Sequence, residues 1–162
     1  MTFLEELSEF IQEGRRHKLS IFCIGNVLKG DDALGPIIAK KLQGQISSDV
    51  LLFDTGSQPE NFITELRRNN ISHCLMIDAL EFKGKPGNIG FFDPTEVSDF
   101  YGTFSTHYLS MKSLIDFMIQ QTGSKFRILG IQPFTLEIGK QVSTPVQNSI
   151  ERLIKLLKQL LE

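Results

Sequence analysis

The segment "LSIFCIGNVLKGDDALGP", from Leu19 to Pro36, indicates the fold class of this chain. Its first six residues form a short apolar run, as expected of a strand that is buried on both faces of a parallel sheet. Glycines and two adjacent carboxylates, Asp31 and Asp32, follow this run. A helix is then expected over residues 33–43, with Pro36 tolerated only in its first turn. A buried strand that leads directly into a helix is typical of α/β proteins.

The same alternation of elements continues along the chain. Further strands are expected over residues 50–54, 73–79, 89–93 and 126–131. Helices are expected over residues 2–14, 57–69, 94–101, 108–121 and 144–161. Capping boxes are predicted for three of these helices, formed by Ser57 and Glu60, by Asp93 and Glu96, and by Thr144 and Gln147. The pattern predicts a three-layer α/β/α fold with a mostly parallel, about five-stranded sheet, in a single domain spanning residues 1–162.

Composition excludes several classes of protein. The formal net charge is −2 and the pI is about 5.9, so a nucleic-acid-binding surface is not expected. No apolar run approaches the roughly 20 residues of a membrane span, and the N-terminus is acidic first and basic later, unlike a secretory signal. Cys23 and Cys74 each lie within an apolar run and do not form a CxxC motif. We therefore expect both to be buried thiols of a protein in the reducing cytoplasm.

Polar residues follow the predicted strands, at the edge where α/β folds bind ligands. They are Asn26, Asp31 and Asp32 after the first strand, Asp54 and Gly56 after the second, Asp78 after the third and Gln132 after the fifth, with His107 in the connector that precedes the helix after the fourth. Carboxylates gathered at one edge repel each other unless a cation lies between them. Two carboxylates and an imidazole would leave coordination positions open, as a catalytic metal site requires, and zinc, nickel and manganese would all tolerate this set.

Other interpretations of these residues remain open at this point. Asp31 or Asp32 can serve only as a helix N-cap, and a lone histidine such as His107 is often structural. A glycine-rich nucleotide loop is disfavoured because "GNVLKGDD" lacks both standard spacings, and its acids oppose an anion. A phosphate-receiving signalling domain also gathers acids at strand ends, but it carries a lysine where this chain has Gln132 and Pro133.

Five motifs in order resemble those of one known family. They are "GNVLKGDDALGP", "DTGSQPEN", "MIDALEFKGKPGNI", "STHYLS" and "ILGIQP". Their order and spacing are similar to those of hydrogenase maturation endopeptidases. Among these, they most resemble the branch that processes large subunits of formate-hydrogenlyase-type (group 4) nickel–iron hydrogenases. The resemblance covers residues 19–160. Residues 1–17 lie outside it as an N-terminal helical extension, which either packs on the sheet or serves as an interaction element.

The resemblance implies a metal-dependent, aspartyl-type endopeptidase of the cytoplasm. Such an enzyme removes the C-terminal extension of the hydrogenase large-subunit precursor, its protein partner, after nickel has been inserted. The nickel is then supplied by the precursor, and zinc, cadmium or manganese are also able to occupy the site. No nucleic acid and no membrane is implied.

The resemblance also assigns roles to individual residues. The family's metal-contacting residues fall on Asp32, Asp78 and His107, and of these Asp32 and Asp78 are the catalytic candidates. Asp54 and Gly56 match a D-x-G segment that lines the substrate-binding cleft. Asp31 has no ligand role to carry over, so an architectural role such as an N-cap suits it. The alternative function is a non-enzymatic maturation chaperone that binds metal and precursor through the same three residues.

Overall fold

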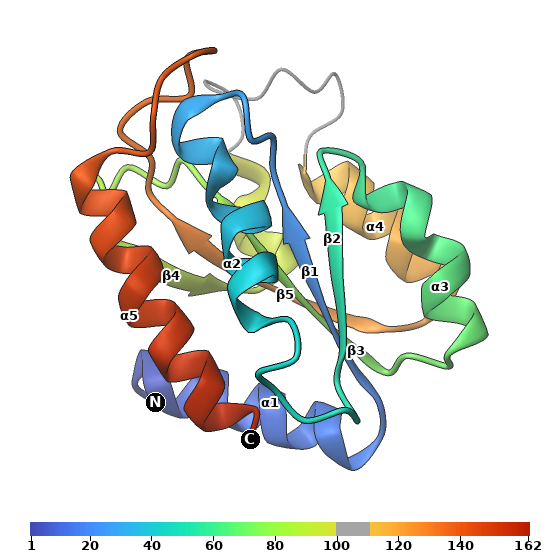
Figure 1. The fold of residues 1–162 in the computed structure, drawn as a ribbon. Coiled ribbons are helices and arrows are strands. Elements are labelled where there is room, and N and C mark those ends of the chain that lie inside the picture. Colours follow the sequence, from blue (N-terminus) through green and yellow to red (C-terminus); the bar gives the residue numbers. More distant parts are fainter. Residues whose placement is uncertain (100–110) are drawn as a thin grey trace.

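A five-stranded sheet forms the middle of the molecule, with the strands in the order β2-β1-β3-β5-β4 (Figure 1). The strands are β1 (Leu19–Ile24), β2 (Leu51–Gly56), β3 (His73–Ala79), β4 (Ile89–Phe92) and β5 (Lys125–Ile131). This computed structural model describes residues 1–99 and 111–162. The first four strands in spatial order are parallel, and β4 pairs antiparallel with β5. The predicted sheet is therefore confirmed.

Helices cover both faces of this sheet. They are α1 (Phe3–Arg16), α2 (Leu34–Leu42), α3 (Ile63–Arg68), α4 (Met111–Thr122) and α5 (Thr144–Leu160), with 3₁₀ turns η1 (Gly30–Ala33), η2 (Pro59–Phe62) and η3 (Pro94–Asp99). Helices α1, α2 and α5 pack on one face, while α3 and α4 pack on the other. The three-layer α/β/α prediction is confirmed. Within the described ranges, no helix has the length and apolar character needed to cross a membrane.

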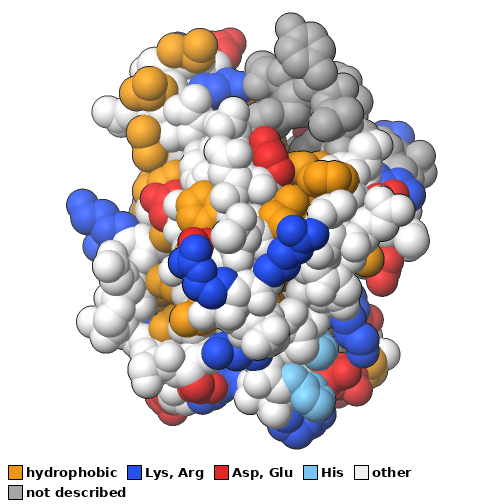
Figure 2. Space-filling view, turned by 90° about the vertical axis from the view of Figure 1, so that its right-hand side faces the viewer, with side chains coloured by type: hydrophobic (Ala, Val, Ile, Leu, Met, Phe, Trp, Pro, Cys, Tyr) orange, Lys and Arg blue, Asp and Glu red, His pale blue; other side chains and the backbone are white. Residues whose placement is uncertain are grey.

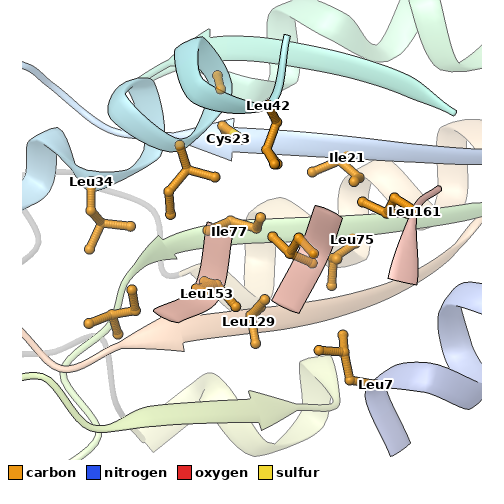
Figure 3. Close-up of a cluster of buried hydrophobic side chains, with 14 of the residues drawn as sticks. Leu7, Ile21, Cys23, Leu34, Leu42, Leu75, Ile77, Leu129, Leu153 and Leu161 are labelled. Carbon is orange, nitrogen blue, oxygen red and sulfur yellow. The ribbon is translucent and has the colours of Figure 1, made fainter. Parts of the chain in front are cut away.

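The apolar runs at residues 19–24 and 73–79 form β1 and β3, two neighbouring strands in the interior of the sheet. Every residue of β1 and of β3 is buried. On the face covered by α2 and α5, side chains from strands and helices meet in one cluster (Figure 3), which includes Leu75 and Ile77 of β3, Leu42 of α2 and Leu153 of α5. Each such side chain contributes roughly 1.5–3 kcal/mol when fully buried, which explains why these runs determine the fold.

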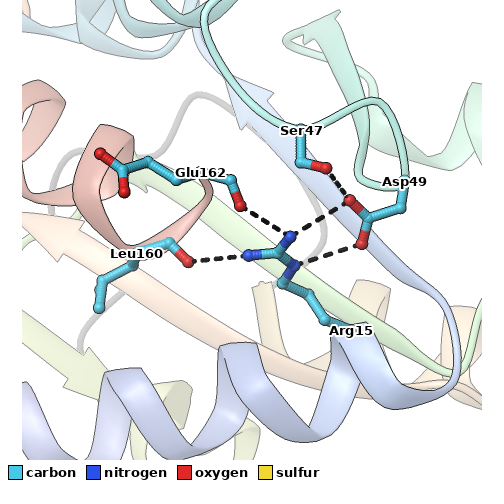
Figure 4. A network of polar contacts seen from close by, with 5 residues as sticks. All are labelled: Arg15, Ser47, Asp49, Leu160 and Glu162. Carbon is cyan, nitrogen blue, oxygen red and sulfur yellow. Dashed lines mark hydrogen bonds and ion pairs between the residues drawn. The ribbon is translucent and has the colours of Figure 1, made fainter.

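The N-terminal helix is part of the layer formed by α2 and α5. Leu7 of α1 is fully buried in the same cluster. Arg15 ties the end of α1 to the end of the chain, because its guanidinium donates to the main-chain oxygens of Leu160 at 3.2 Å and Glu162 at 2.9 Å (Figure 4). It also donates to both carboxylate oxygens of Asp49, at 3.2 and 3.3 Å. Of the two roles expected for residues 1–17, the structure shows the packing role.

Two of the three predicted capping boxes are wrong. At the third, the main-chain N–H of Asp93 donates to the Glu96 carboxylate at 3.1 Å, and the Asp93 carboxylate accepts from the N–H of Thr95 at 3.0 Å. The turn after β2 begins as 3₁₀ helix at Pro59, with Gln58 rather than Ser57 as its N-cap residue and no capping side chain. Helix α5 has Ser143 as its N-cap, and again no side-chain cap. The main-chain N–H of Ser143 instead donates to the carboxylate of Asp31 at 2.7 Å. The N–H of the N-cap residue of α5 is thus bound by a distant carboxylate and not by a side chain of the same helix.

Candidate active site

Asp32 and Asp78 lie at the carboxyl edge of the parallel strands. Asp78 is the second-last residue of β3 and is only 6% exposed. Asp32 lies on η1, which follows β1 and contacts β3. Because Cys23 of β1 pairs with Ile77 of β3, the two strands end at the same level. The structure therefore brings both carboxylates to one edge, and their catalytic and metal-binding roles stay predictions.

The backbone that precedes Asp32 fixes the position of its side chain. The main-chain N–H of Asn26 donates to Oδ2 of Asp32 at 2.9 Å. Gly25, with φ of +152°, lies so close that a Cβ there would be 1.9 Å from the carbonyl oxygen of Asp32. Only glycine permits this approach. The side chain of Asp32 stays partly exposed, so water and substrate can reach it.

The third predicted ligand, His107, lies outside the described residues. Within residues 1–99 and 111–162, no three His, Cys, Asp or Glu side chains form a group that could hold a metal ion. The predicted set of Asp32, Asp78 and His107 draws one of its members from outside these ranges. It therefore stays a prediction, for nickel as well as for zinc, cadmium or manganese.

Asp31 has a separate, architectural role. Its side chain is fully buried. Its carboxylate accepts hydrogen bonds from the main-chain N–H groups of Phe134 at 2.7 Å, Thr135 at 3.0 Å and Ser143 at 2.7 Å, and from the Ser143 hydroxyl at 2.9 Å. The prediction that Asp31 is architectural is confirmed. It holds the loop between β5 and α5, however, and does not cap a helix.

Sequence reasoning did not identify the partners of Asp31. They lie 103 to 112 residues further along the chain. A sequence pattern reports mainly on neighbours within a few residues, so it carries no signal for these contacts.

Gln132 also proves to be architectural. It is 3% exposed, and its side-chain oxygen accepts hydrogen bonds from the main-chain N–H groups of Phe82 at 2.9 Å and Gly84 at 3.0 Å. Its side-chain nitrogen donates to Glu81 at 2.6 Å. Gln132 therefore fixes the turn that follows β3, next to Asp78.

A cleft of about 750 Å³ runs along the outer strand, between β2 and α2. Its walls are formed by Val27, Pro36, Ile37, Ala39, Lys40, Gln43, Gly44, Ile46, Ser47, Ser48, Val50, Leu52 and Asp54. Figure 2 views the molecule from the side of β2. Asp54 is exposed, and its Oδ1 accepts a hydrogen bond from the main-chain N–H of Gly56 at 3.2 Å. The carbonyl oxygen of Gly56 accepts one from Gly25 at 3.0 Å, which joins this segment to the loop of Asp32.

This geometry connects the cleft to the carboxylates. The cleft begins at Val27 and Asp54, at the carboxyl edge, and extends to Ser47 and Ser48 near the start of β2. One side of β2 has no partner strand among the described residues. The cleft reaches the loop of Asp32 through Val27, and the substrate-binding role of Asp54 and Gly56 stays a prediction.

Both cysteines are buried and free, as the sequence predicts. Burial raises the pKa of the Cys74 thiol to about 12 and holds the pKa of the Cys23 thiol far above its usual range. Since the thiolate is the nucleophilic form, neither cysteine is prepared for covalent catalysis.

We therefore expect iodoacetamide to leave both thiols of the native protein unmodified and to alkylate both in concentrated urea. Intact-mass spectrometry measures the number of adducts in each state. Treated native protein should also process its substrate at the rate of untreated protein. An adduct on native Cys23, together with lost activity, would show that this thiol takes part in the reaction.

Comparison with known proteins identifies the family of this chain. The family model described as hydrogenase maturation protease matches residues 36–160. The hydrogenase 3 maturation protease of Escherichia coli K12 is 29% identical over 138 residues, which cover 85% of this chain and 87% of that protein.

Solved structures of the same kind share the fold. The crystal structure of a [NiFe] hydrogenase maturation protease, HycI from Thermococcus kodakarensis KOD1, aligns with a TM-score of 0.84 at 27% identity, over 96% of this chain and 98% of that one. The solution structure of the endopeptidase HycI from Escherichia coli aligns with a TM-score of 0.77 at 28% identity, over 88% and 90% of the two chains. The family match and these structural likenesses show that this chain belongs to the hydrogenase maturation protease family.

Proposed function

We propose that this protein is a nickel-dependent endopeptidase of the cytoplasm. It removes the C-terminal extension of a nickel–iron hydrogenase large-subunit precursor after nickel has been inserted. Family membership supports the protease activity. The proposal rests on the position of Asp32 and Asp78 at the same carboxyl edge of the sheet, where η1 contacts β3 and Asp78 is almost fully buried.

The two carboxylates have different surroundings, which suit different roles. Asp78 is buried at the end of a central strand, so its position is fixed by the sheet. Asp32 is partly exposed and oriented by the Asn26 N–H, so it is placed to hold and deprotonate the attacking water. Asp32 takes a proton from the attacking water as the water oxygen adds to the scissile carbonyl carbon, and it passes this proton to the peptide nitrogen as the C–N bond breaks.

The nickel belongs to the precursor in this proposal. Two carboxylate oxygens and one imidazole nitrogen, from Asp32, Asp78 and His107, suit a divalent ion of borderline softness such as nickel. The bound ion would polarise the scissile carbonyl. Because the protein offers an incomplete set of ligands, it would bind free metal weakly and act only on a precursor that already carries the ion.

The cleft along β2 fits the shape of the proposed substrate. A C-terminal extension is a chain end, and a chain end can lie extended beside an unpaired strand edge. Apolar side chains such as Ile37, Ile46 and Leu52 line this cleft, and Lys40 adds one positive charge. We infer that residues flanking the scissile bond lie here, with Asp54 at the end nearest to Asp32.

Co-expression with a large-subunit precursor tests the proposal. We expect the precursor to shift to a faster band on a denaturing gel only when nickel is supplied, and mass spectrometry to show the loss of its C-terminal extension. Precursor that co-elutes with the protein but never shortens would instead support the maturation-chaperone alternative. Shortening that is equally fast in nickel-depleted medium would refute nickel dependence while leaving the protease activity in place.

A further inference from the structure

Four large apolar side chains are exposed on two neighbouring loops at the carboxyl edge. Val27 and Leu28, on the loop after β1, are 63% and 66% exposed. Phe134 and Ile138, on the loop between β5 and α5, are 68% and 78% exposed. The two loops lie together at the top of Figure 1, and Figure 2 shows hydrophobic side chains standing out at that level, on the upper left. We call these four residues the loop patch.

Elsewhere in the described ranges, large apolar side chains with comparable exposure are scattered. Met1 and Leu4 lie at the start of the chain, and Phe117 lies on α4. Single exposed apolar residues are normal on protein surfaces, whereas a group of them marks an interaction site. The clustering on two loops therefore needs a specific explanation.

Hydrogen bonds between the two loops hold the patch in place. The main-chain N–H of Gly139 donates to the carbonyl oxygen of Leu28 at 2.9 Å, and that of Asp31 donates to Thr135 at 2.8 Å. Gly30, with φ of +53°, brings the loops so close that a Cβ there would be 2.7 Å from the oxygen of Thr135. The buried carboxylate of Asp31 adds further bonds from the second loop.

Each loop is also fixed internally. The Leu28 N–H donates to the side-chain oxygen of Asn26 at 2.9 Å, and the Glu137 N–H donates to the Thr135 hydroxyl at 3.2 Å. The patch cannot turn inward without breaking these bonds. Its side chains are thus presented in advance, which lowers the entropy cost of binding a partner.

The surroundings of the patch resemble those of a protein interface. Exposed Glu137 and Lys140 lie on the same loop as Phe134 and Ile138. Apolar centres flanked by mixed charges are typical of protein–protein interfaces. The patch also adjoins the candidate active site, since Leu28 is four residues from Asp32 and Asn26 bonds to both.

We propose that the loop patch docks the folded body of the hydrogenase large-subunit precursor, beside the base of its C-terminal extension. This inference rests on the proposed function. The patch stands out from the surface, so it fits a hollow on a folded partner. The cleft along β2, in contrast, is concave and fits an extended chain. A partner seated on the patch would place its chain end at Asp32.

The test uses the double variant Leu28→Ser/Phe134→Ser, which leaves the cleft residue Val27 unchanged. Binding is measured with nickel-free precursor, and cleavage with nickel-loaded precursor. We expect Kd to rise by about 10- to 100-fold, because truncating an interface anchor commonly costs tenfold or more. We expect KM to rise while kcat stays within about twofold, since these residues do not touch the reacting atoms. The matched control is Leu4→Ser/Phe117→Ser, which removes two apolar side chains exposed elsewhere and should change neither constant.

A precursor shortened to its mature length separates the body from the extension. It should still bind the protein, and its binding should weaken equally in the double variant. If only full-length precursor responds to the double variant, the occupant is the extension and the proposal is wrong. If precursor binding is unchanged and only self-association in the ultracentrifuge is lost, the patch is an interface between copies, and the proposal is also wrong.

These measurements also separate this inference from the proposed function. If the double variant binds and cleaves normally, docking by the patch is refuted and the protease proposal stands. If the wild-type protein binds the precursor through the patch but never cleaves it, the docking proposal stands and the protease proposal fails. If the wild-type protein binds no precursor, both are refuted.

Discussion

Replacing Asp32 by Asn is expected to slow precursor processing by about 10²- to 10⁴-fold, the range that a positioned general base contributes. Asn keeps an oxygen that can accept the hydrogen bond from the Asn26 N–H, so the loop should retain its shape. It cannot take a proton from water or supply the negative charge that a divalent ion prefers. The measurement is the rate of shortening of nickel-loaded precursor, followed by gel or mass spectrometry.

The matched control for this change is Asp116→Asn. It alters a carboxylate on α4 in the same way. Among the described residues Asp116 pairs with Lys112 at the surface, where an ion pair adds little stability. Both variants should melt at the temperature of the wild-type protein. Processing by a correctly folded Asp32→Asn protein at the control rate would remove Asp32 from the mechanism and leave Asp78 as the remaining carboxylate candidate.

Replacing Asp31 by Ala is expected to lower the free energy of unfolding by about 2–4 kcal/mol. The change leaves three main-chain donors and the Ser143 hydroxyl without their acceptor. A hydrogen bond to a charged group is worth about 1.5–3 kcal/mol, and part of this loss is recovered because the loop can open to water. Urea unfolding followed by circular dichroism measures the difference.

Ser143→Ala provides the graded comparison for Asp31→Ala. It removes one donor and keeps the main-chain bonds, so it should cost only about 1 kcal/mol. We also expect Asp31→Ala to reduce processing, because Asp31 positions the loop that carries Asp32. A loss of stability for Asp31→Ala no larger than that for Ser143→Ala would show that the carboxylate does not hold the two loops together.

Most of the fold could be predicted because buried strands and amphipathic helices leave recognisable patterns of apolar residues in the sequence. Strands buried on both faces are predominantly apolar, so the strand 73–79 was located at both ends and the strand 19–24 likewise. The helices over residues 2–14 and 108–121 were predicted from the spacing of apolar residues, and those that begin near residues 57, 94 and 144 were predicted from capping and proline signals. The beginning of the helix predicted from residue 108 lies among residues 100–110, outside the described ranges.

Helix starts were predicted less well, for a physical reason. A capping box is a local signal, and two of the three predicted boxes, those at Ser57 and at Thr144, do not form. In the structure, Pro59 begins a tighter turn and Asp31 takes the N–H of Ser143. Contacts made in the folded structure, and not the predicted local side chains, determine how these two helices begin. Such contacts cannot be derived from the spacing of residues in the sequence.

The site could be predicted in part. Parallel strands end at one edge, so the acids after β1 and β3 were expected to come together, and Asp32 and Asp78 do lie at that edge. The loop patch was not predicted, because apolar residues within a polar loop look the same whether they are buried or exposed. The exposure of Leu28 and Phe134 is seen only in the folded structure, where the two side chains are 66% and 68% exposed.

The carboxylate of Asp31 also constrains the order in which the molecule can fold. Its partners lie 103 to 112 residues towards the C-terminus. Contacts between residues so far apart in sequence close large loops, so they tend to form late. During synthesis, the turn that carries Asp32 therefore waits without its anchor until residues 134–143 have left the ribosome and reached the sheet. A nascent chain would complete the edge that carries Asp32 and Asp78 only after its last loop and helix have been made.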